Sequence, residues 1–458
     1  MISIKTPIIP IQPTFVGTPN SLDYKAICIF SALGFFLDDD TYFLEQKALK
    51  PGHVYNIEGD TIVNETPYFS WHYTPKERSF SQVVLEFGTL FESIIKEQTQ
   101  GKQVILPLSG GLDSRTQAVA LARIGANVRS YSYRFQGGHN ESAYGENIAK
   151  LCDFPFQDFT VPNGYLWPCI EDLATINGCY SEFTHPRQMA FKDAYTTMGN
   201  VFSLGHWGDV MFDDMGIDDD LNFDGQVDVL FKKIIKKGGL ELANKLWKHW
   251  GLEGEFKDYL YNRISKLHAK IPIKNNANAR VRAFKSMYWA PRWTSVNLSV
   301  FASVHPITLP YYDSRMCEFI CTVPERYLAN RQIQIAYIKQ HMEAVAKVTW
   351  QDQRPFNLLN YHYNKTPWNL PYRVYDKLKR SLHPNAYIMR NWELQFLGAQ
   401  NANHLEQYLF NEPLVSKVLP QSEILNLYTK FKTEDGVTYS HPISMLLTLS
   451  LFFKQHYL

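Results

Sequence analysis

A short apolar strand that leads through a glycine-containing loop into a helix is the feature that most constrains the fold of this chain. Residues 104–108 are apolar, and a helix is expected from about residue 114. The connecting residues are Leu108, Ser109, Gly110, Gly111, Leu112, Asp113 and Ser114. Glycines let a backbone approach an anion closely, helix-opening N–H groups point at it, and serine hydroxyls add donors. The loop is therefore predicted to bind phosphate.

The carboxylate inside this loop indicates that a metal ion accompanies the phosphate. Asp113 would repel a bare phosphate group, whereas Mg²⁺ binds carboxylate and phosphate oxygens together. The loop lacks the Lys-Ser or Lys-Thr ending of the Walker loop, which is typical of enzymes that transfer the γ-phosphoryl group of ATP. We therefore expect ATP and Mg²⁺ as cofactors.

The elements expected around the loop alternate between helices and strands. An amphipathic helix is predicted over 79–98, strands over 104–108 and 128–135, and helices over about 114–124 and 140–150. This order predicts a βαβ unit and an α/β fold, with a parallel sheet wrapped by helices. Ligands bind such sheets beyond the carboxyl ends of their strands.

Composition narrows the class of protein further. With 458 residues and 45% hydrophobic content, the chain is long enough for two or three lobes around a large core. Its net charge of +1 gives no drive toward nucleic acid, which we do not expect as a partner. Because no long apolar run or leader-like start occurs, we expect no membrane partner and a cytoplasmic location.

The loop Ser-Gly-Gly-Leu-Asp-Ser after an apolar strand resembles that of the ATP pyrophosphatases, and much of the chain is similar to the synthetase domain of asparagine synthetases. The segment 309–313, Leu-Pro-Tyr-Tyr-Asp, adds to this resemblance. The resemblance implies an adenine nucleotide α-hydrolase-like fold with a helical C-terminal half. It also implies cleavage of ATP between the α and β phosphates.

The same resemblance implies how the chain is divided. Residues 1–98 are expected to be a lead-in and linker-like segment, 99–225 a nucleotide-binding core, and 226–458 a mainly helical remainder. We expect the glutaminase domain of that family to be missing, because Met1 is followed by Ile2 and the first cysteine is Cys28. We therefore expect nitrogen from a separate glutaminase or other ammonia-supplying protein, or an amine that arrives as substrate.

A second loop resembles the other signature of that family. Residues 201–203 read as a strand, and the loop after it contains Gly205, His206 and Asp209. The resemblance places Asp209 beside Asp113 as a second Mg²⁺ ligand, although a cap for the next helix is an alternative role. Leu108, Tyr133 and Gly205 are expected to form walls near the nucleotide.

Catalytic roles are expected for three residues. The family has Glu where this chain has His206, whose imidazole is either a general base for the attacking amine or a structural group. The family also uses a basic residue from its C-terminal half. Arg354 and Lys365 are the candidates here, and a solvated surface charge is the alternative for each.

Together these features predict an AMP-forming, ATP-dependent carbon–nitrogen ligase. A small-molecule or peptide carboxylate would be activated as an acyl-adenylate, and an amine or ammonia would displace AMP. One alternative is an intramolecular cyclase similar to β-lactam synthetases or lasso-peptide cyclases. Others are an ammonia-fed enzyme of surface-sugar or secondary-metabolite synthesis and a catalytically silent ATP-binding scaffold.

Overall fold

A five-stranded sheet contains all the strands predicted around the loop, and the loop follows the carboxyl end of one of them. The computed structural model describes residues 1–8, 10, 12–138, 140–183, 185–382, 396, 398–411 and 415–457. The strands are β6 (Gln103–Pro107), β7 (Asn127–Phe135), β8 (Phe156–Val161), β9 (Val201–Ser203) and β10 (Ile307–Thr308). Their spatial order is β10-β9-β6-β7-β8, and every neighbouring pair is parallel. The predicted α/β fold with a parallel sheet is confirmed.

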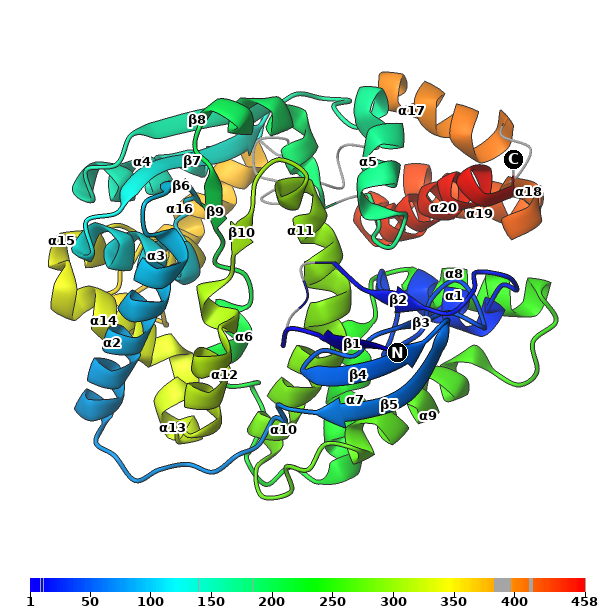
Figure 1. The fold of residues 1–458 in the computed structure, drawn as a ribbon. Coiled ribbons are helices and arrows are strands. Elements are labelled where there is room, and N and C mark those ends of the chain that lie inside the picture. Colours follow the sequence, from blue (N-terminus) through cyan, green and yellow to red (C-terminus); the bar gives the residue numbers. More distant parts are fainter. Residues whose placement is uncertain are drawn as a thin grey trace.

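Helices cover both faces of this sheet (Figure 1). The chain forms α2 (Phe80–Thr99), α3 (Leu112–Arg123), α4 (Ser142–Leu151) and α14 (Gln332–His341), which pack on one another and on the sheet. The other face is covered by η2 (Arg187–Thr197) and α11 (Ser295–Ala302), and the hydroxyls of Tyr131 and Tyr195 lie 2.7 Å apart there. The predicted helix over 79–98 is confirmed, and Ser79 closes its first turn in a capping box.

The N-terminal region forms a small sheet of its own. Here β1 (Ile2–Lys5) pairs antiparallel with β4 (His53–Glu58), which pairs with β5 (Thr61–Pro67). A further pair joins β2 (Phe15–Val16) and β3 (Lys47–Ala48). The first residues are therefore held by sheet pairing, rather than running as an unpaired lead-in.

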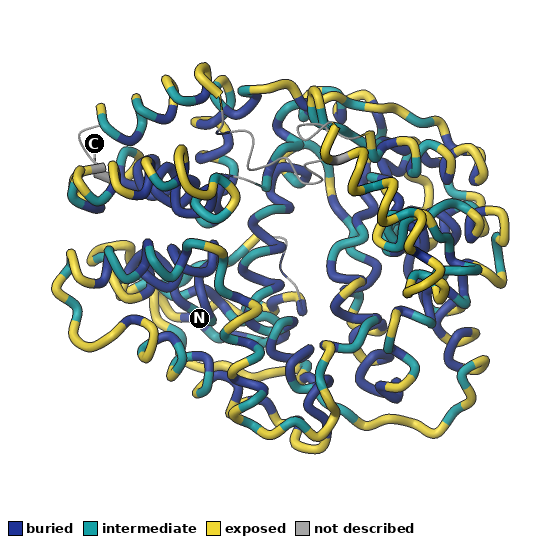
Figure 2. The backbone as a smooth tube through the Cα atoms, turned by 180° about the vertical axis from the view of Figure 1, so that it is seen from behind, coloured by how far each residue is buried: buried dark blue, intermediate teal, exposed yellow. Residues whose placement is uncertain are grey.

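The first helix ties this region to the rest of the molecule. The side chain of Asp23 caps α1 (Tyr24–Leu33), and Gly34 ends it with a left-handed conformation at φ 76°. Its buried side chains belong to the same hydrophobic core as those of α2 and β6. Figure 2 shows buried positions, in dark blue, throughout the interior of the molecule. The division at residues 98 and 225 stays a prediction.

The C-terminal half is helical, as predicted. The short helix α6 (Gly208–Met211) follows β9 and packs on α3, and the π-helix η3 (Lys285–Thr294) lies between α10 and α11. The remaining helices are α5 (Ile170–Asn177), α7 (Phe223–Ile234), α8 (Gly239–His249), α9 (Phe256–Ala269), α10 (Ala277–Phe284), α12 (Ser314–Cys321), α13 (Glu325–Leu328), α15 (Glu343–Ala346), α16 (Leu370–Leu382), α17 (Ala399–Glu406), α18 (Val415–Val418), α19 (Gln421–Thr433) and α20 (Gly436–Tyr457). In the described part of the chain, no helix is both long and apolar enough to cross a membrane.

Candidate functional site

The sheet has one point at which its connections reverse direction. From the central strand β6 the chain moves to β7 and β8 on one side, whereas β9 and β10 lie on the other side. The loops that follow β6 and β9 therefore diverge, and a crevice opens between them at the carboxyl ends of the strands. Ligands of open α/β sheets bind at such a point. Both predicted motif loops begin there.

The loop after β6 is organised by its own serines. The backbone N–H of Ser109 donates to the Ser114 hydroxyl at 3.1 Å, and the N–H of Gly111 donates to the Ser109 hydroxyl at 3.2 Å. Gly111 caps α3, so the free N–H groups of a 12-residue helix open toward the loop. The arrangement is suited to an anion, as predicted from the glycines and serines.

Gly110 packs against residues behind the loop, and its contact with phosphate stays a prediction. A Cβ atom there would lie 2.9 Å from the Cβ atoms of both Tyr144 and Gln351, so the glycine allows close packing behind the loop. Its carbonyl accepts hydrogen bonds from Arg115 at 2.9 Å and from the Gln351 N–H at 3.2 Å. Gly110 is not among the residues that line the cavity described below.

The two predicted acidic residues come together at the crevice. A Cβ atom on Gly208 would lie 2.2 Å from Asp113 Oδ1, so only glycine lets the second loop approach this closely. The negative charge of Asp209, in the first turn of α6, acts on Asp113. Burial, together with Asp209, raises the pKa of Asp113 to about 6, against the lowering effect of Arg331.

Arg331 and Gln334 hold Asp113 in place, and sequence reasoning missed both. The Arg331 guanidinium contacts Asp113 Oδ1, and Gln334 Nε2 donates to the same oxygen at 3.1 Å. The hydroxyl of Tyr311, from the segment 309–313, donates to the Asp113 carbonyl at 3.2 Å. No local motif pointed to Arg331, because it lies more than 200 residues from the loop. Its backbone is left-handed, at φ 58°.

The pair of carboxylates fits a divalent cation that arrives with phosphates. Asp113 and Asp209 repel each other, and a cation between them would relieve that repulsion. Among the described residues no cluster of three or more His, Cys, Asp or Glu is placed to hold a metal. A metal held here would therefore need oxygens from its ligand, and Asp113 and Asp209 would supply the protein's share.

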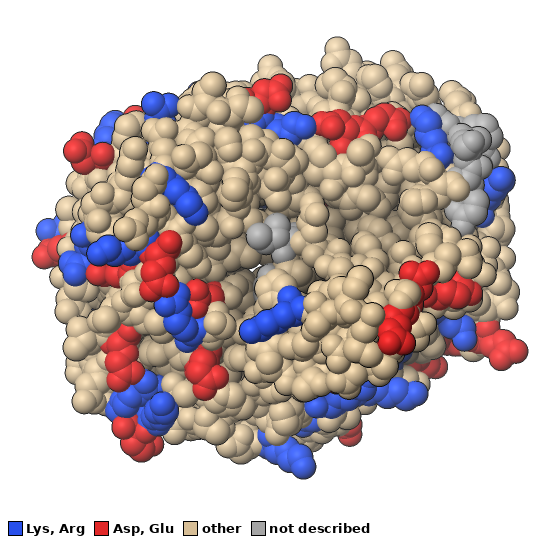
Figure 3. Space-filling model, in the orientation of Figure 1, with Lys and Arg blue, Asp and Glu red and all other residues tan. Residues whose placement is uncertain are grey.

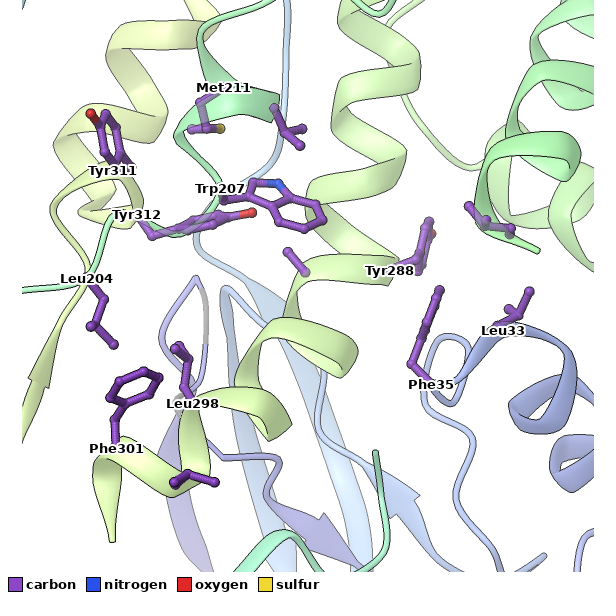
Figure 4. Close-up of a cluster of buried hydrophobic side chains, with 14 of the residues drawn as sticks. Leu33, Phe35, Leu204, Trp207, Met211, Tyr288, Leu298, Phe301, Tyr311 and Tyr312 are labelled. Atoms are coloured by element: carbon purple, nitrogen blue, oxygen red, sulfur yellow. The ribbon is translucent and has the colours of Figure 1, made fainter. Parts of the chain in front are cut away.

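A cavity of about 1080 Å³ connects both loops. It is lined by most of the predicted site residues, namely Leu108, Ser109, Gly111, Leu112, Asp113, Ser114, Tyr133, Gly205, His206 and Asp209. Its apolar walls include Leu204, Trp207 and Phe301, and Figure 4 shows Leu204 beside Phe301, and Trp207 beside Tyr312. Tyr133 forms a side wall and accepts a hydrogen bond from Arg187 Nε at 2.6 Å.

The structure does not bring Arg354 or Lys365 into this cavity. Neither residue lines it, and Lys365 is exposed at the surface. The same segment instead contributes Gln351 and Asp352, because Gln351 is anchored to the backbone of the loop after β6. The basic residues that do line the cavity come from other elements and are Arg187, Lys236, Lys237, Lys285 and Arg331.

His206 reaches the cavity but is poorly suited to accept a proton. Burial lowers the pKa of its imidazole to about 4, although Asp209 opposes the shift. Its Nδ1 atom is buried without a hydrogen-bond partner in the described part of the chain. Because a general base is most effective when its pKa lies near the working pH, this imidazole is a weak base at neutral pH.

Lys285 is a better candidate for proton transfer, and no motif pointed to it. The residue opens η3 and lines the cavity, with Nζ 5.7 Å from the Trp207 ring centre and 5.3 Å from that of Trp289. Burial lowers its pKa to about 8, and Asp209 acts in the opposite direction. A lysine with this pKa in a cavity is often functional.

Similarity to known proteins is found among solved structures only. No family model and no curated protein matches this sequence. Solved structures do match, among them the NMN synthetase from Francisella tularensis, at 12% identity and a TM-score of 0.22. That alignment covers 31% of this chain and 59% of the NMN synthetase chain. The resemblance to asparagine synthetases therefore depends on the motif residues alone.

Proposed function

We propose that the protein is an ATP-dependent ligase that joins a carboxylate to an amine with formation of AMP and pyrophosphate. The observation that carries the proposal is the convergence of Asp113 and Asp209 at the reversal point of the sheet, beside the serine loop. The resemblance of that loop to those of the ATP pyrophosphatases favours cleavage between the α and β phosphates.

Binding would use the loop after β6. Backbone N–H groups at the start of α3 and the hydroxyls of Ser109 and Ser114 would receive the β and γ phosphates. Asp113 and Asp209 would hold Mg²⁺, which supplies positive charge to the triphosphate when bound. Leu108, Tyr133 and Gly205 would border the nucleotide, since all three line the cavity.

The first chemical step needs charge stabilisation more than proton transfer. An oxygen of the substrate carboxylate would attack the α-phosphorus, and the bond to the β-phosphate oxygen would break, releasing pyrophosphate. Arg331 is buried beside both acidic residues and would help keep that end of the cavity electrically balanced. The product of this step is an acyl-adenylate.

In the second step an amine would attack the acyl carbon, and AMP would leave with the bonding electrons. The attacking nitrogen must lose a proton. We assign this proton to Lys285 in its neutral form, because its lowered pKa and its place in the cavity suit it better than His206. Arg354 and Lys365 have no role in this scheme.

The experiment is to incubate the protein with ATP, Mg²⁺ and pools of candidate carboxylic acids. The proposal predicts acid-dependent release of pyrophosphate together with AMP. Release of ADP and phosphate would contradict it, and absence of any nucleotide turnover would favour an ATP-binding scaffold. Dependence on added ammonia or amine would separate the intermolecular reaction from an intramolecular cyclisation.

A further inference from the structure

The surface helix α16 directs its apolar side toward solvent. Leu370, Val374, Leu378 and Leu382 follow one another at intervals of four residues, which places them along one side of the helix. Their exposed fractions are 44%, 57%, 60% and 74%. An amphipathic helix in a globular protein normally buries this side against the core.

The apolar surface extends beyond the four aliphatic residues. Tyr375 is 60% exposed, and just before the helix Trp368 is 63% and Tyr363 43% exposed. Of the 17 large hydrophobic residues exposed in the described part of the chain, seven lie between residues 363 and 382. Figure 2 shows the molecule from the side on which α16 lies, with much of the exposed colour there. A concentration of this kind marks an interaction surface.

The rest of the helix is basic, and the helix contacts the protein through its polar side. Its 13 residues include four Lys or Arg, at 373, 377, 379 and 380, and one acidic residue, Asp376. Among its described side chains only Tyr372 and Asp376 are half-buried, and both lie on the side opposite Val374 and Leu378. Since the whole chain carries a net charge of only +1, this positive charge is local.

We propose that α16 binds in the plane of a membrane surface that contains anionic lipid. Leucine and valine along one side, Lys and Arg flanking that side, and aromatic residues nearby are the composition of helices that lie at the lipid–water boundary. The charge argues for lipid rather than for an uncharged apolar groove, because each basic residue near an anionic leaflet strengthens binding roughly fivefold. The proposal is independent of the proposed ligase function.

This inference revises the expectation of no membrane partner. That expectation rested on the lack of long apolar runs, which excludes a spanning segment in the described helices but not a helix lying in the interface. In Figure 3, which views the opposite face, Lys and Arg alternate with Asp and Glu without a single-sign patch.

The test is co-sedimentation of the full chain with vesicles of phosphatidylcholine alone or mixed with phosphatidylglycerol. We expect binding to the mixed vesicles and much weaker binding to phosphatidylcholine. V374E/L378E should abolish binding, and R373Q/K377Q should weaken it about 25-fold through the loss of two charges. The matched controls L85E/L425E and K248Q/K266Q change residues that are equally exposed on other helices, and should bind as the unaltered chain does.

Three results would overturn the proposal. These are no sedimentation with either vesicle, equal binding to both, or binding that V374E/L378E leaves unchanged. Light scattering on the same samples tests whether a second copy of the chain, and not lipid, covers this surface. A dimer that V374E/L378E dissociates, without lipid binding, would assign this surface to a second copy of the chain. Circular dichroism of each variant would show that the fold is retained.

Discussion

Asp113 is the residue on which the chemistry of the cavity depends. It is held between a cation and an amide, Arg331 and Gln334, and it feels the charge of Asp209. These contacts fix one carboxylate oxygen. Burial and the like charge of Asp209 oppose ionisation of the carboxyl group and so raise its pKa. Such an environment is typical of a functional carboxylate. By contrast, the more exposed carboxylates of Asp158 and Asp172 are paired with Arg134 and Lys192, respectively.

Asp113→Asn should therefore lower acid-dependent pyrophosphate release by roughly 10²–10³-fold, the usual cost of removing one electrostatic stabiliser. The measurement is the rate of pyrophosphate formation with the acid identified in the substrate pools. Asp158→Asn is the matched control, since Asp158 lies on β8 of the same sheet in an exposed ion pair with Arg134 at 3.4 Å. Equal rates in the two variants would remove Asp113 from the mechanism.

Lys285 predicts a specific dependence of stability on pH. Burial lowers its pKa in the folded protein to about 8, from 10.5 in the unfolded chain. Between these values the unfolded state binds more protons, so this group makes the free energy of unfolding rise as the pH increases from about 8 to 10.5. Below pH 8 both states are protonated and the dependence vanishes.

Urea unfolding at several pH values measures this effect. Relative to Lys285→Met, which has no such group, the unaltered protein should gain stability across that interval. Lys237→Met, at an exposed position in the same cavity, is the control and should follow the unaltered protein. Parallel stability profiles for Lys285→Met and the unaltered protein would show that Lys285 is not buried as a charged group.

At the scale of elements, one buried side chain joins the loop after β6 to the segment after α15. Arg115 of α3 is fully buried and donates to the carbonyls of Gly110, Val348 and Thr349 at 2.8–2.9 Å. Burial lowers its pKa to about 10, so it is still charged at neutral pH. Because three backbone carbonyls share this donor, the loop and the segment that carries Gln351 are positioned together.

Replacing Arg115 with Met should destabilise the protein by about 3 kcal/mol or more, because several buried carbonyls lose their donor. Denaturant unfolding measures the loss. Arg123→Met, which removes an exposed ion pair with Glu92 from the same helix, should cost less than about 1 kcal/mol. Similar losses in both variants would mean that the buried hydrogen bonds do not hold the loop.

Local patterns in the sequence predicted the elements around the loop closely. The strand expected over 104–108 is β6 at Gln103–Pro107, and that expected over 128–135 is β7 at Asn127–Phe135. Periodicity and capping are local properties, so they can be read from neighbouring residues. The paired β1 strand was missed because its partner is β4, about 50 residues away.

The same distinction divides the site. Ser109, Asp113 and Asp209 were predicted because each belongs to a short motif, and the structure places them in one cavity. Arg331 and Lys285 were missed because only tertiary packing brings them there. Arg354 and Lys365 were chosen by resemblance over a segment without a tight motif, and the chain directs Gln351 inward instead.

At the scale of the whole molecule, the cavity lies between the five-stranded sheet and helices from the C-terminal part of the chain. Its lining combines the loops after β6 and β9 with η3, and with His441 of α20. A volume of about 1080 Å³ exceeds the range of most small-molecule sites, so it leaves room for a second substrate beside a nucleotide. A two-substrate reaction therefore suits this shape.

The central claim is that ATP with Mg²⁺ occupies the crevice beside Ser109, and calorimetric titration of ATP into the protein tests it most directly. The account predicts one site per chain, lost in Gly111→Trp, whose new side chain would fill the phosphate loop without backbone strain at φ −74°. Ser93→Trp, on an exposed position of α2, should bind ATP normally. No binding to the unaltered protein, or full binding to Gly111→Trp, would contradict the account.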